Sequence, residues 1–174
     1  ESMGLIDDAV VADLFAGSGA MGIEALSRGA ARCTFVERDR SALAALKANL
    51  DALRLGDRTT VVTSDVMAWV PAMRGVDLAL VDLSMPGMTG LELIRRIKGE
   101  YPHTAVLVLS MHAEEQYALR AFKAGANGYL TKDSAAEELM RAVRKVSGGG
   151  AYVTASLAER VVLPGQGAMR DCMR

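Results

Sequence analysis

The chain has 174 residues, of which 51% are hydrophobic and 24% are charged, and its formal net charge is -1. This composition is typical of a folded globular domain and excludes disorder throughout the chain. The balanced charge excludes a general basic field toward nucleic acid or an anionic membrane, although a local basic patch stays open. The two cysteines (Cys33, Cys172) and two histidines (His103, His112) form neither a disulfide framework nor a metal-ligand pattern.

Segments that would target the chain to a membrane or for export are not apparent. No uninterrupted apolar run reaches the roughly 18 residues of a membrane span, and the first residues lack a signal-peptide pattern. With so few cysteines, the sequence predicts a reducing, cytoplasmic location without a membrane partner.

Short apolar runs alternate with longer amphipathic segments along the chain. The predicted strands cover residues 9–15, 33–37, 59–63, 76–81, 105–109 and 128–130. The predicted helices cover residues 19–28, 40–54, 66–73, 89–99, 113–124, 134–146 (capped by Ser134) and 156–163. Because parallel strands need such crossovers, the alternation predicts an α/β fold: a doubly wound, three-layer α/β/α sandwich with a mostly parallel, Rossmann-like sheet. Residues 164–174 show no periodic apolar face, so we expect a disordered tail.

A glycine-rich loop follows the first predicted strand. The segment Gly17–Gly22 spells G-x-G-x-x-G at the opening of a helix, where missing side chains let backbone N–H groups approach a ligand. Glu37 ends the second strand, at the distance along the chain where a carboxylate accepts hydrogen bonds from ribose hydroxyls. The pattern favours a nucleoside site. The alternative is a tight turn beside a solvated glutamate.

The surrounding residues, Val-Ala-Asp-Leu-Phe-Ala-Gly-Ser-Gly-Ala-Met-Gly at Val11–Gly22, resemble the S-adenosylmethionine loop of class I methyltransferases. With residues 23–30 and 35–39, they look most like bacterial enzymes that methylate a guanine N2 of small-subunit ribosomal RNA. The resemblance covers residues 1 to about 82. It implies that the chain binds S-adenosylmethionine or S-adenosylhomocysteine. Asp13, Gly17, Ser18 and Gly19 would contact the methionine portion of the cofactor. Glu37 would contact the ribose, and Asp65 and Val66 would contact the adenine.

The fourth strand departs from that family. Methyltransferases of this type continue with Asp/Asn-Pro-Pro-Tyr, which holds the target amino group, whereas this chain reads Asp82-Leu83-Ser84-Met85. Without that positioning an in-line methyl transfer loses most of its rate. We therefore expect cofactor binding without an intact catalytic site, and no RNA substrate.

From Val76 onward the sequence resembles a different family. The segment Val81–Gly90 (Val-Asp-Leu-Ser-Met-Pro-Gly-Met-Thr-Gly) looks like the phosphorylation loop of response-regulator receiver domains, and residues 108–110 and 121–133 continue the likeness to NarL/FixJ-type receivers, through about residue 163. The resemblance implies that Asp82 is the phospho-acceptor and that the Ser110 hydroxyl contacts the phosphoryl group. It also implies that Lys132 is the cationic partner of that group and that Tyr129 is the rotating aromatic residue. The alternative is that Ser110 belongs to an ordinary capped turn, that Lys132 is a surface lysine and that Tyr129 is a half-buried aromatic residue.

Receivers also hold Mg²⁺ on an acidic pair after their first strand. Here Asp13 is the one acid at that place, and the second member of the pair is missing. The resemblance therefore implies an incomplete magnesium site at Asp82, and we expect no bound Mg²⁺ or other metal. The helix-turn-helix region that follows such receivers is not recognisable, so we expect no DNA binding.

The two likenesses meet at one strand without a linker. We expect an engineered recombination in which residues 1–80 and 76–163 form one domain, 1–163, with strand order 3-2-1-4-5-6 and a cleft between strands one and four. The favoured function is a module that binds S-adenosylmethionine or S-adenosylhomocysteine with methyl transfer lost. The alternatives are a crippled phospho-accepting receiver of a two-component system and a scaffold without activity. The oligomeric state stays open.

Overall fold

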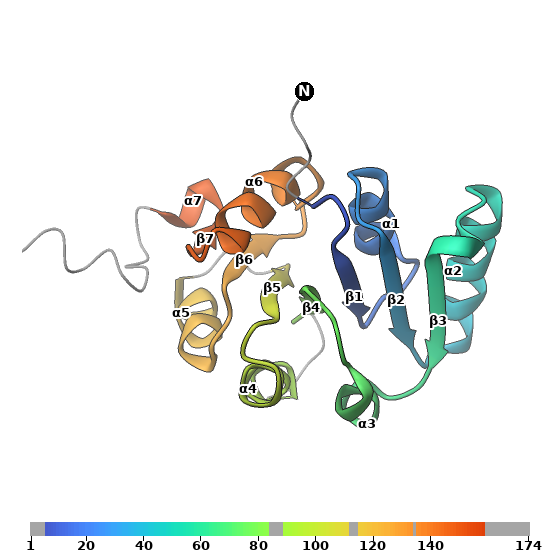
Figure 1. The fold of residues 1–174 in the computed structure, drawn as a ribbon. Coiled ribbons are helices and arrows are strands. Elements are labelled where there is room, and N and C mark those ends of the chain that lie inside the picture. Colours follow the sequence, from blue (N-terminus) through green and yellow to red (C-terminus); the bar gives the residue numbers. More distant parts are fainter. Residues whose placement is uncertain (1–5, 84–88, 112–114, 134, 159–174) are drawn as a thin grey trace, which may run out of the picture.

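A single parallel sheet organises the protein in a computed structural model that describes residues 6–83, 89–111, 115–133 and 135–158 (Figure 1). All six neighbouring pairs of strands are parallel. The order across the sheet is β3 (Thr59–Thr63), β2 (Arg32–Glu37), β1 (Val10–Leu14), β4 (Leu78–Asp82), β5 (Ala105–Ser110), β6 (Gly128–Thr131) and β7 (Tyr152–Val153). The predicted order 3-2-1-4-5-6 is confirmed, with one strand added at the end.

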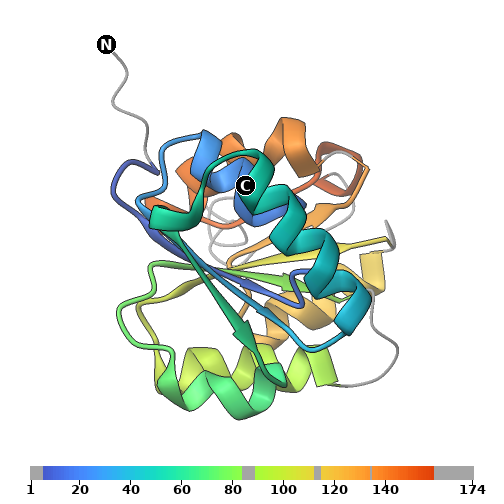
Figure 2. The same cartoon turned by 90° about the vertical axis from the view of Figure 1, so that its right-hand side faces the viewer.

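Helices cover both faces of this sheet (Figures 1 and 2). One face carries α1 (Ala20–Ser27), α2 (Arg40–Ala52) and α6 (Ala135–Ser147). The other carries α3 (Val66–Trp69), α4 (Thr89–Glu100) and α5 (Glu115–Ala124), and α7 (Ala155–Ala158) follows β7. The predicted three-layer α/β/α sandwich is thus confirmed.

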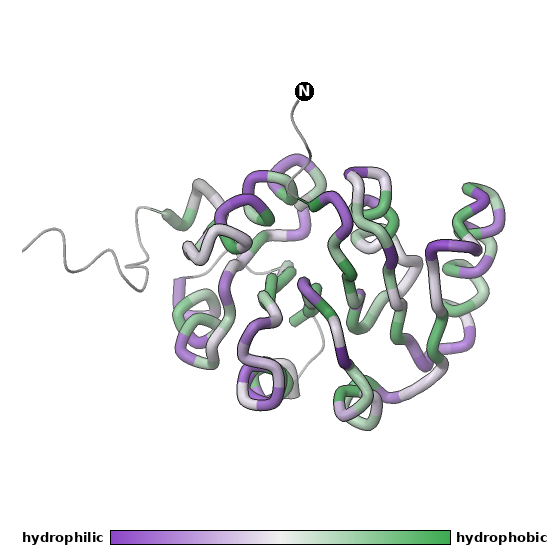
Figure 3. The backbone as a smooth tube through the Cα atoms, in the orientation of Figure 1, coloured by the Kyte–Doolittle hydropathy of each residue, from purple (hydrophilic) through white to green (hydrophobic). Residues whose placement is uncertain are grey.

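The central strands are apolar on both faces because helices bury both. In β1 and β4 all residues but one are buried, and the backbone tube shows these strands as hydrophobic (Figure 3). Strand β3 lies at the sheet edge and is only partly buried, which fits its threonine-rich sequence. Continuous apolar runs are therefore typical of the interior of this sheet, as expected for parallel strands.

The expected join at residues 76–82 lies in the middle of the sheet. Strand β4 pairs with β1 on one side and with β5 on the other, so Leu78 lies opposite both Val11 and Ala105. Leu80 and Val81 are completely buried, and each belongs to a core cluster that includes residues from before and after the join. Both halves therefore share one interior.

The last strand was not predicted. Strand β7 has only two residues, which give no periodic signal, yet its backbone extends the ladder: Tyr152 N donates to Asn127 O at 3.0 Å and Thr154 N to Tyr129 O at 3.1 Å. Strand β4 begins at Leu78 rather than at Val76, and the carboxylate of Asp77 just before it accepts a hydrogen bond from Val10 N at 2.9 Å. The predictions of a cap at Ser134 and a tail at 164–174 lie outside the described residues.

The lengths of the helices can be compared with the length that a membrane span requires. In the part of the chain that the structure describes, no helix is both long and apolar enough to cross a membrane.

Candidate functional site

Two adjoining pockets lie where β1 and β4 end, at the point where the strand order reverses. In doubly wound sheets, ligands bind at this switch point. Each pocket has a volume of about 270 Å³, and the two share Phe15, Gly17 and Asp82 in their walls. Together they fall within the roughly 300–1,000 Å³ typical of small-molecule sites.

The glycine loop forms the wall between β1 and α1. Gly17 and Gly19 have φ angles of 58° and 84°, in the left-handed region that glycine adopts without strain. A Cβ at Gly19 would lie 3.2 Å from the Phe35 ring and closer still to Leu46, so a side chain there would push the loop off the sheet. The loop thus needs glycine for its own geometry, independently of any ligand.

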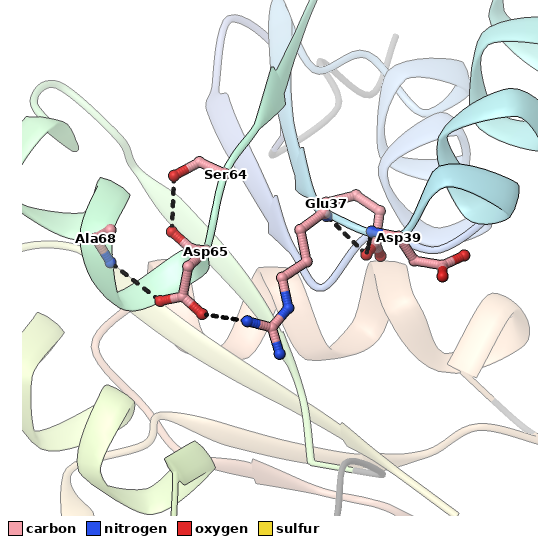
Figure 4. Close-up of polar contacts among 6 residues, drawn as sticks. Glu37, Asp39, Ser64, Asp65 and Ala68 are labelled. Carbon is pink, nitrogen blue, oxygen red and sulfur yellow. Dashed lines mark hydrogen bonds and ion pairs between the residues drawn. The ribbon is translucent and has the colours of Figure 1, made fainter.

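Glu37 ties the end of β2 to this loop. Its Oε2 accepts a hydrogen bond from Gly17 N at 2.9 Å. Its Oε1 accepts from Arg38 N at 2.9 Å and from Asp39 N at 3.0 Å (Figure 4). A carboxylate has about four acceptor positions, so these bonds leave capacity for a hydroxyl group. Glu37 therefore has a structural role, and its predicted contact with a ribose stays a prediction.

Asp65 lies across the same pocket at the start of α3. Its Oδ1 accepts from Ala68 N at 3.2 Å, which caps the helix, and its Oδ2 lies 3.3 Å from an Arg38 guanidinium nitrogen (Figure 4). The predicted adenine contacts Asp65 and Val66 and the predicted ribose contact Glu37 line this first pocket. It is lined by Phe15, Gly17, Glu37, Arg38, Asp39, Ala42, Ser64, Asp65, Val66 and Asp82.

Asp13 lies in the wall of the second pocket with only 4% of its surface exposed. Its Oδ2 accepts a hydrogen bond from Gly22 N at 2.9 Å. Burial raises the pKa of Asp13 to about 7, and the nearby Asp82 and Glu37 carboxylates add to this increase against the lowering effect of the Gly22 N–H. Asp13 therefore carries a proton far more readily than an exposed aspartate does.

Asp82 and Lys132 meet at the ends of β4 and β6. Lys132 Nζ lies 2.6 Å from Asp82 Oδ2, and the Asp82 side chain is 20% exposed. The pair converges because parallel strands end at the same edge of the sheet. The second pocket contains both charges and is lined by Asp13, Phe15, Ala16, Gly17, Ser18, Ala20, Met21, Asp82, Leu109 and Lys132.

The other two residues of the receiver-like set are buried. Ser110 ends β5 next to this pair and has no exposed surface, and its carbonyl accepts from Lys132 N at 2.8 Å. Tyr129 is also fully buried, in the core beneath α4 and α5, where its ring packs rather than faces solvent. Neither lines the two pockets described above, so their predicted roles in phosphorylation stay predictions.

The side chains at Asp82 do not suit Mg²⁺. Asp13 is buried and its Oδ2 is engaged by Gly22 N, Asp82 is paired with an ammonium group, and residues 14–17 offer no further carboxylate. Among the residues that the structure describes, no group of three or more histidine, cysteine, aspartate or glutamate side chains could hold a metal ion. Mg²⁺ needs several oxygen ligands in octahedral geometry, which these side chains do not supply.

Phe15 and Arg38 are among the pocket residues that sequence reasoning missed. Phe15 has a φ of 62°, a left-handed conformation that is unusual for an aromatic residue, and it lines both pockets. Arg38 lines the first pocket and bridges to Asp65. Nothing in the sequence marks Phe15, whereas the position of Arg38 directly after Glu37 could have indicated a pocket residue.

Similarity to known proteins spans most of the sheet. The family model described as the response regulator receiver domain matches residues 34–144. Response regulator UvrY of Escherichia coli O157:H7 is 35% identical over 99 residues, which are 57% of this chain and 45% of that protein. The chain thus spans about half the length of the curated relatives it matches.

Two solved structures resemble the fold over different shares of the chain. A two-component response regulator of the LuxR family from Aurantimonas sp. SI85-9A1 is 26% identical with a TM-score of 0.54, over 80% of this chain and 97% of that chain. A candidate methylase from Haemophilus influenzae is 28% identical with a TM-score of 0.50, over 54% of this chain and 61% of that chain.

The receiver similarity is the broader of the two. Its family match begins at residue 34, inside the half that resembles methyltransferases, and runs through β4, β5 and β6. The expected recombination of two families and the expected lack of DNA binding stay predictions. The chain belongs to the response regulator receiver domain family.

Proposed function

We propose that this receiver domain accepts a phosphoryl group on Asp82. The observation that supports the proposal is the contact of 2.6 Å between Lys132 Nζ and Asp82 Oδ2, which puts a cation beside the nucleophile. The partial exposure of Asp82 in a pocket wall gives a small phosphodonor access to the carboxylate.

The proposed step transfers the phosphoryl group directly. A carboxylate oxygen of Asp82 forms a new P–O bond with acetyl phosphate while the P–O bond to the acetyl group breaks, and acetate leaves with the electron pair. Lys132 offsets part of the charge that collects on the phosphoryl oxygens. Because the acidic pair is incomplete, we expect a slow reaction that added Mg²⁺ does not accelerate.

The prediction is a mass gain of one phosphoryl group when the protein is incubated with acetyl phosphate. Intact-mass spectrometry measures the yield, in parallel reactions with Mg²⁺ and with a chelator. Asp82→Asn should abolish the gain, and Lys132→Met should lower its rate by about 10-fold, as expected when a charged partner is lost. An equal mass gain in Asp82→Asn would contradict the assignment.

A second candidate function is binding of a nucleoside cofactor of the S-adenosylmethionine type. The pocket that contains Glu37, Asp65 and Val66 supports it, because these are the three residues that the methyltransferase resemblance assigns to the ribose and the adenine. The similarity to a candidate methylase over 54% of the chain points the same way. Methyl transfer is not part of this proposal, since Leu83, Ser84 and Met85 stand where that family has Pro-Pro-Tyr.

Calorimetric titration with S-adenosylhomocysteine tests the second candidate. We expect saturable binding that Ala42→Arg abolishes, because the longer charged side chain would fill the pocket from the first turn of α2. The same substitution should leave the phosphorylation of Asp82 unchanged. Absence of heat from the folded protein would refute cofactor binding while leaving the phosphoryl proposal intact.

A further inference from the structure

Asp13 is a carboxyl group of the second pocket to which the proposed phosphoryl transfer gives no role. It lies in the pocket wall with only 4% of its surface exposed, whereas aspartate is rarely buried so fully without an oppositely charged partner. Among the residues that the structure describes, its carboxyl group has one hydrogen bond, which Gly22 N donates to Oδ2 at 2.9 Å. The Oδ1 atom is therefore available for a ligand in the pocket.

The strand register brings Asp13 and Asp82 to the same face of the sheet. Asp13 in β1 lies opposite Leu80 in β4, and Asp82 follows Leu80 by two residues. Because residues two apart in a strand point to the same face, both carboxyl groups point to the side that α1 covers. Lys132 follows Leu130 of β6 by two residues and ends on this side as well. A phosphoryl group on Asp82 would thus have the Lys132 ammonium on one side and the Asp13 carboxyl group on the other.

The surroundings of Asp13 favour its neutral form. Burial is the largest cause that raises the pKa of Asp13 to about 7, and the carboxylates of Asp82 and Glu37 raise it further, against the lowering effects of the Gly22 N–H and the Lys132 ammonium. Burial also raises the pKa of the neighbouring Cys33 thiol, which therefore stays uncharged. The groups that act on Asp13 are Gly22 in α1, Glu37 and Cys33 in β2, Asp82 in β4 and Lys132 after β6. Near and below neutral pH, Asp13 is thus a buried O–H donor.

We propose that Asp13 is a further catalytic residue, whose protonated carboxyl group donates a hydrogen bond to the phosphoryl group as this group is transferred to Asp82. Because the side chains here do not suit Mg²⁺, this hydrogen bond and the Lys132 ammonium together offset the charge on the phosphoryl oxygens. The proton stays on Asp13 throughout, so no bond forms or breaks beyond those of the phosphoryl transfer. The inference rests on the proposed phosphorylation of Asp82 and adds its control by pH.

Ionised Asp13 has the opposite effect on the reaction. A carboxylate has no proton to donate, and its negative charge repels the oxygens of the incoming phosphoryl group. Loss of a hydrogen bond to a charged group corresponds to about a 10-fold change in rate or more. The phosphorylation of Asp82 should therefore become about 10-fold slower as the pH rises through about 7.

Asp13→Asn isolates the effect of the proton. The asparagine oxygen can accept from Gly22 N as Asp13 Oδ2 does, while the amide N–H groups donate at every pH. Intact-mass spectrometry after incubation with acetyl phosphate measures the rate. We expect the variant to match the original protein at about pH 6 and to react about 10-fold faster at about pH 8. Circular dichroism at each pH shows that both proteins are folded during the reaction.

Asp51→Asn, at an exposed position of α2, is the matched control and should keep the pH profile of the original protein. Parallel pH profiles for Asp13→Asn and the original protein would overturn the inference, and so would a variant that reacts more slowly at every pH. In both cases the phosphorylation of Asp82 itself would stand. Absence of a mass gain at any pH would instead refute the proposed phosphorylation, and with it the role of Asp13.

Discussion

Asp13→Asn is expected to remove most of the pH dependence of stability and to stabilise the protein at neutral pH. Burial raises the pKa of Asp13 to about 7 in the folded protein, whereas an aspartate in the unfolded chain has its ordinary pKa of 3.8. The difference between these two pKa values corresponds to roughly 4 kcal/mol. Asparagine keeps an oxygen that accepts from Gly22 N but carries no charge at any pH.

The direction of the effect follows from proton binding. Between about pH 4 and pH 7 the folded protein holds a proton on Asp13 that the unfolded chain has released, so the free energy of unfolding falls as the pH rises. The stabilisation is complete below about pH 4 and is lost as the pH passes through 7. Near pH 8 the variant should therefore be more stable than the original protein by up to roughly 4 kcal/mol, and near pH 4 the two should be similar.

Urea denaturation across this pH range measures the difference. Asp51→Asn, at an exposed position of α2, serves as the control and should leave the pH profile as it is. Parallel stability profiles for Asp13→Asn and the original protein would show that Asp13 is not protonated in the fold.

Gly22→Val is expected to destabilise the domain by about 3 kcal/mol or more, because the first turns of α1 approach the sheet closely. A Cβ at this position would lie 2.8 Å from Cys33 Sγ and 2.9 Å from Asp13 Oδ2, and closer still to the Phe35 ring. None of these groups can retreat easily, since all three residues are buried in β1 and β2. The helix would have to shift, and the glycine loop would shift with it.

The control for this variant is a glycine with room around it. Gly99 lies in α4, and nothing approaches within 4 Å of the position of an added Cβ. Gly99→Ala should raise stability by about 0.5–1 kcal/mol through helix propensity. Urea midpoints of the two variants should therefore move in opposite directions, and a Gly22→Val midpoint equal to that of the original protein would contradict the close packing of α1.

Much of the fold is predictable because its signals are local. The apolar runs of β1 and β4 and the glycine loop between β1 and α1 follow from residues that are adjacent in the chain. Strand β7 is not predictable in this way, since two residues of strand carry no period and their pairing with β6 depends on the position of α6. Its parallel pairing is a consequence of tertiary packing.

The candidate site likewise has features that the sequence predicts and features that depend on tertiary packing. The convergence of Asp82 and Lys132 was predictable, because the carboxyl ends of parallel strands meet at one edge of the sheet. The burial of Asp13 was not, because it depends on how α1 packs over β1, and the left-handed conformation of Phe15 leaves no mark in the sequence. The sequence therefore identifies which groups can meet, whereas their protonation and strain follow only from packing.

The role of Asp82 as the phosphoryl acceptor is tested most directly by locating the modified residue in the chain. After incubation with acetyl phosphate, borohydride reduction converts an aspartyl phosphate to homoserine, and tryptic cleavage after Arg74 and Arg95 isolates residues 75–95 for sequencing by mass spectrometry. We predict homoserine at position 82 and unmodified aspartate at Asp77 of the same peptide. Homoserine at Asp77, or an unmodified peptide from a protein that has gained a phosphoryl group, would contradict the account.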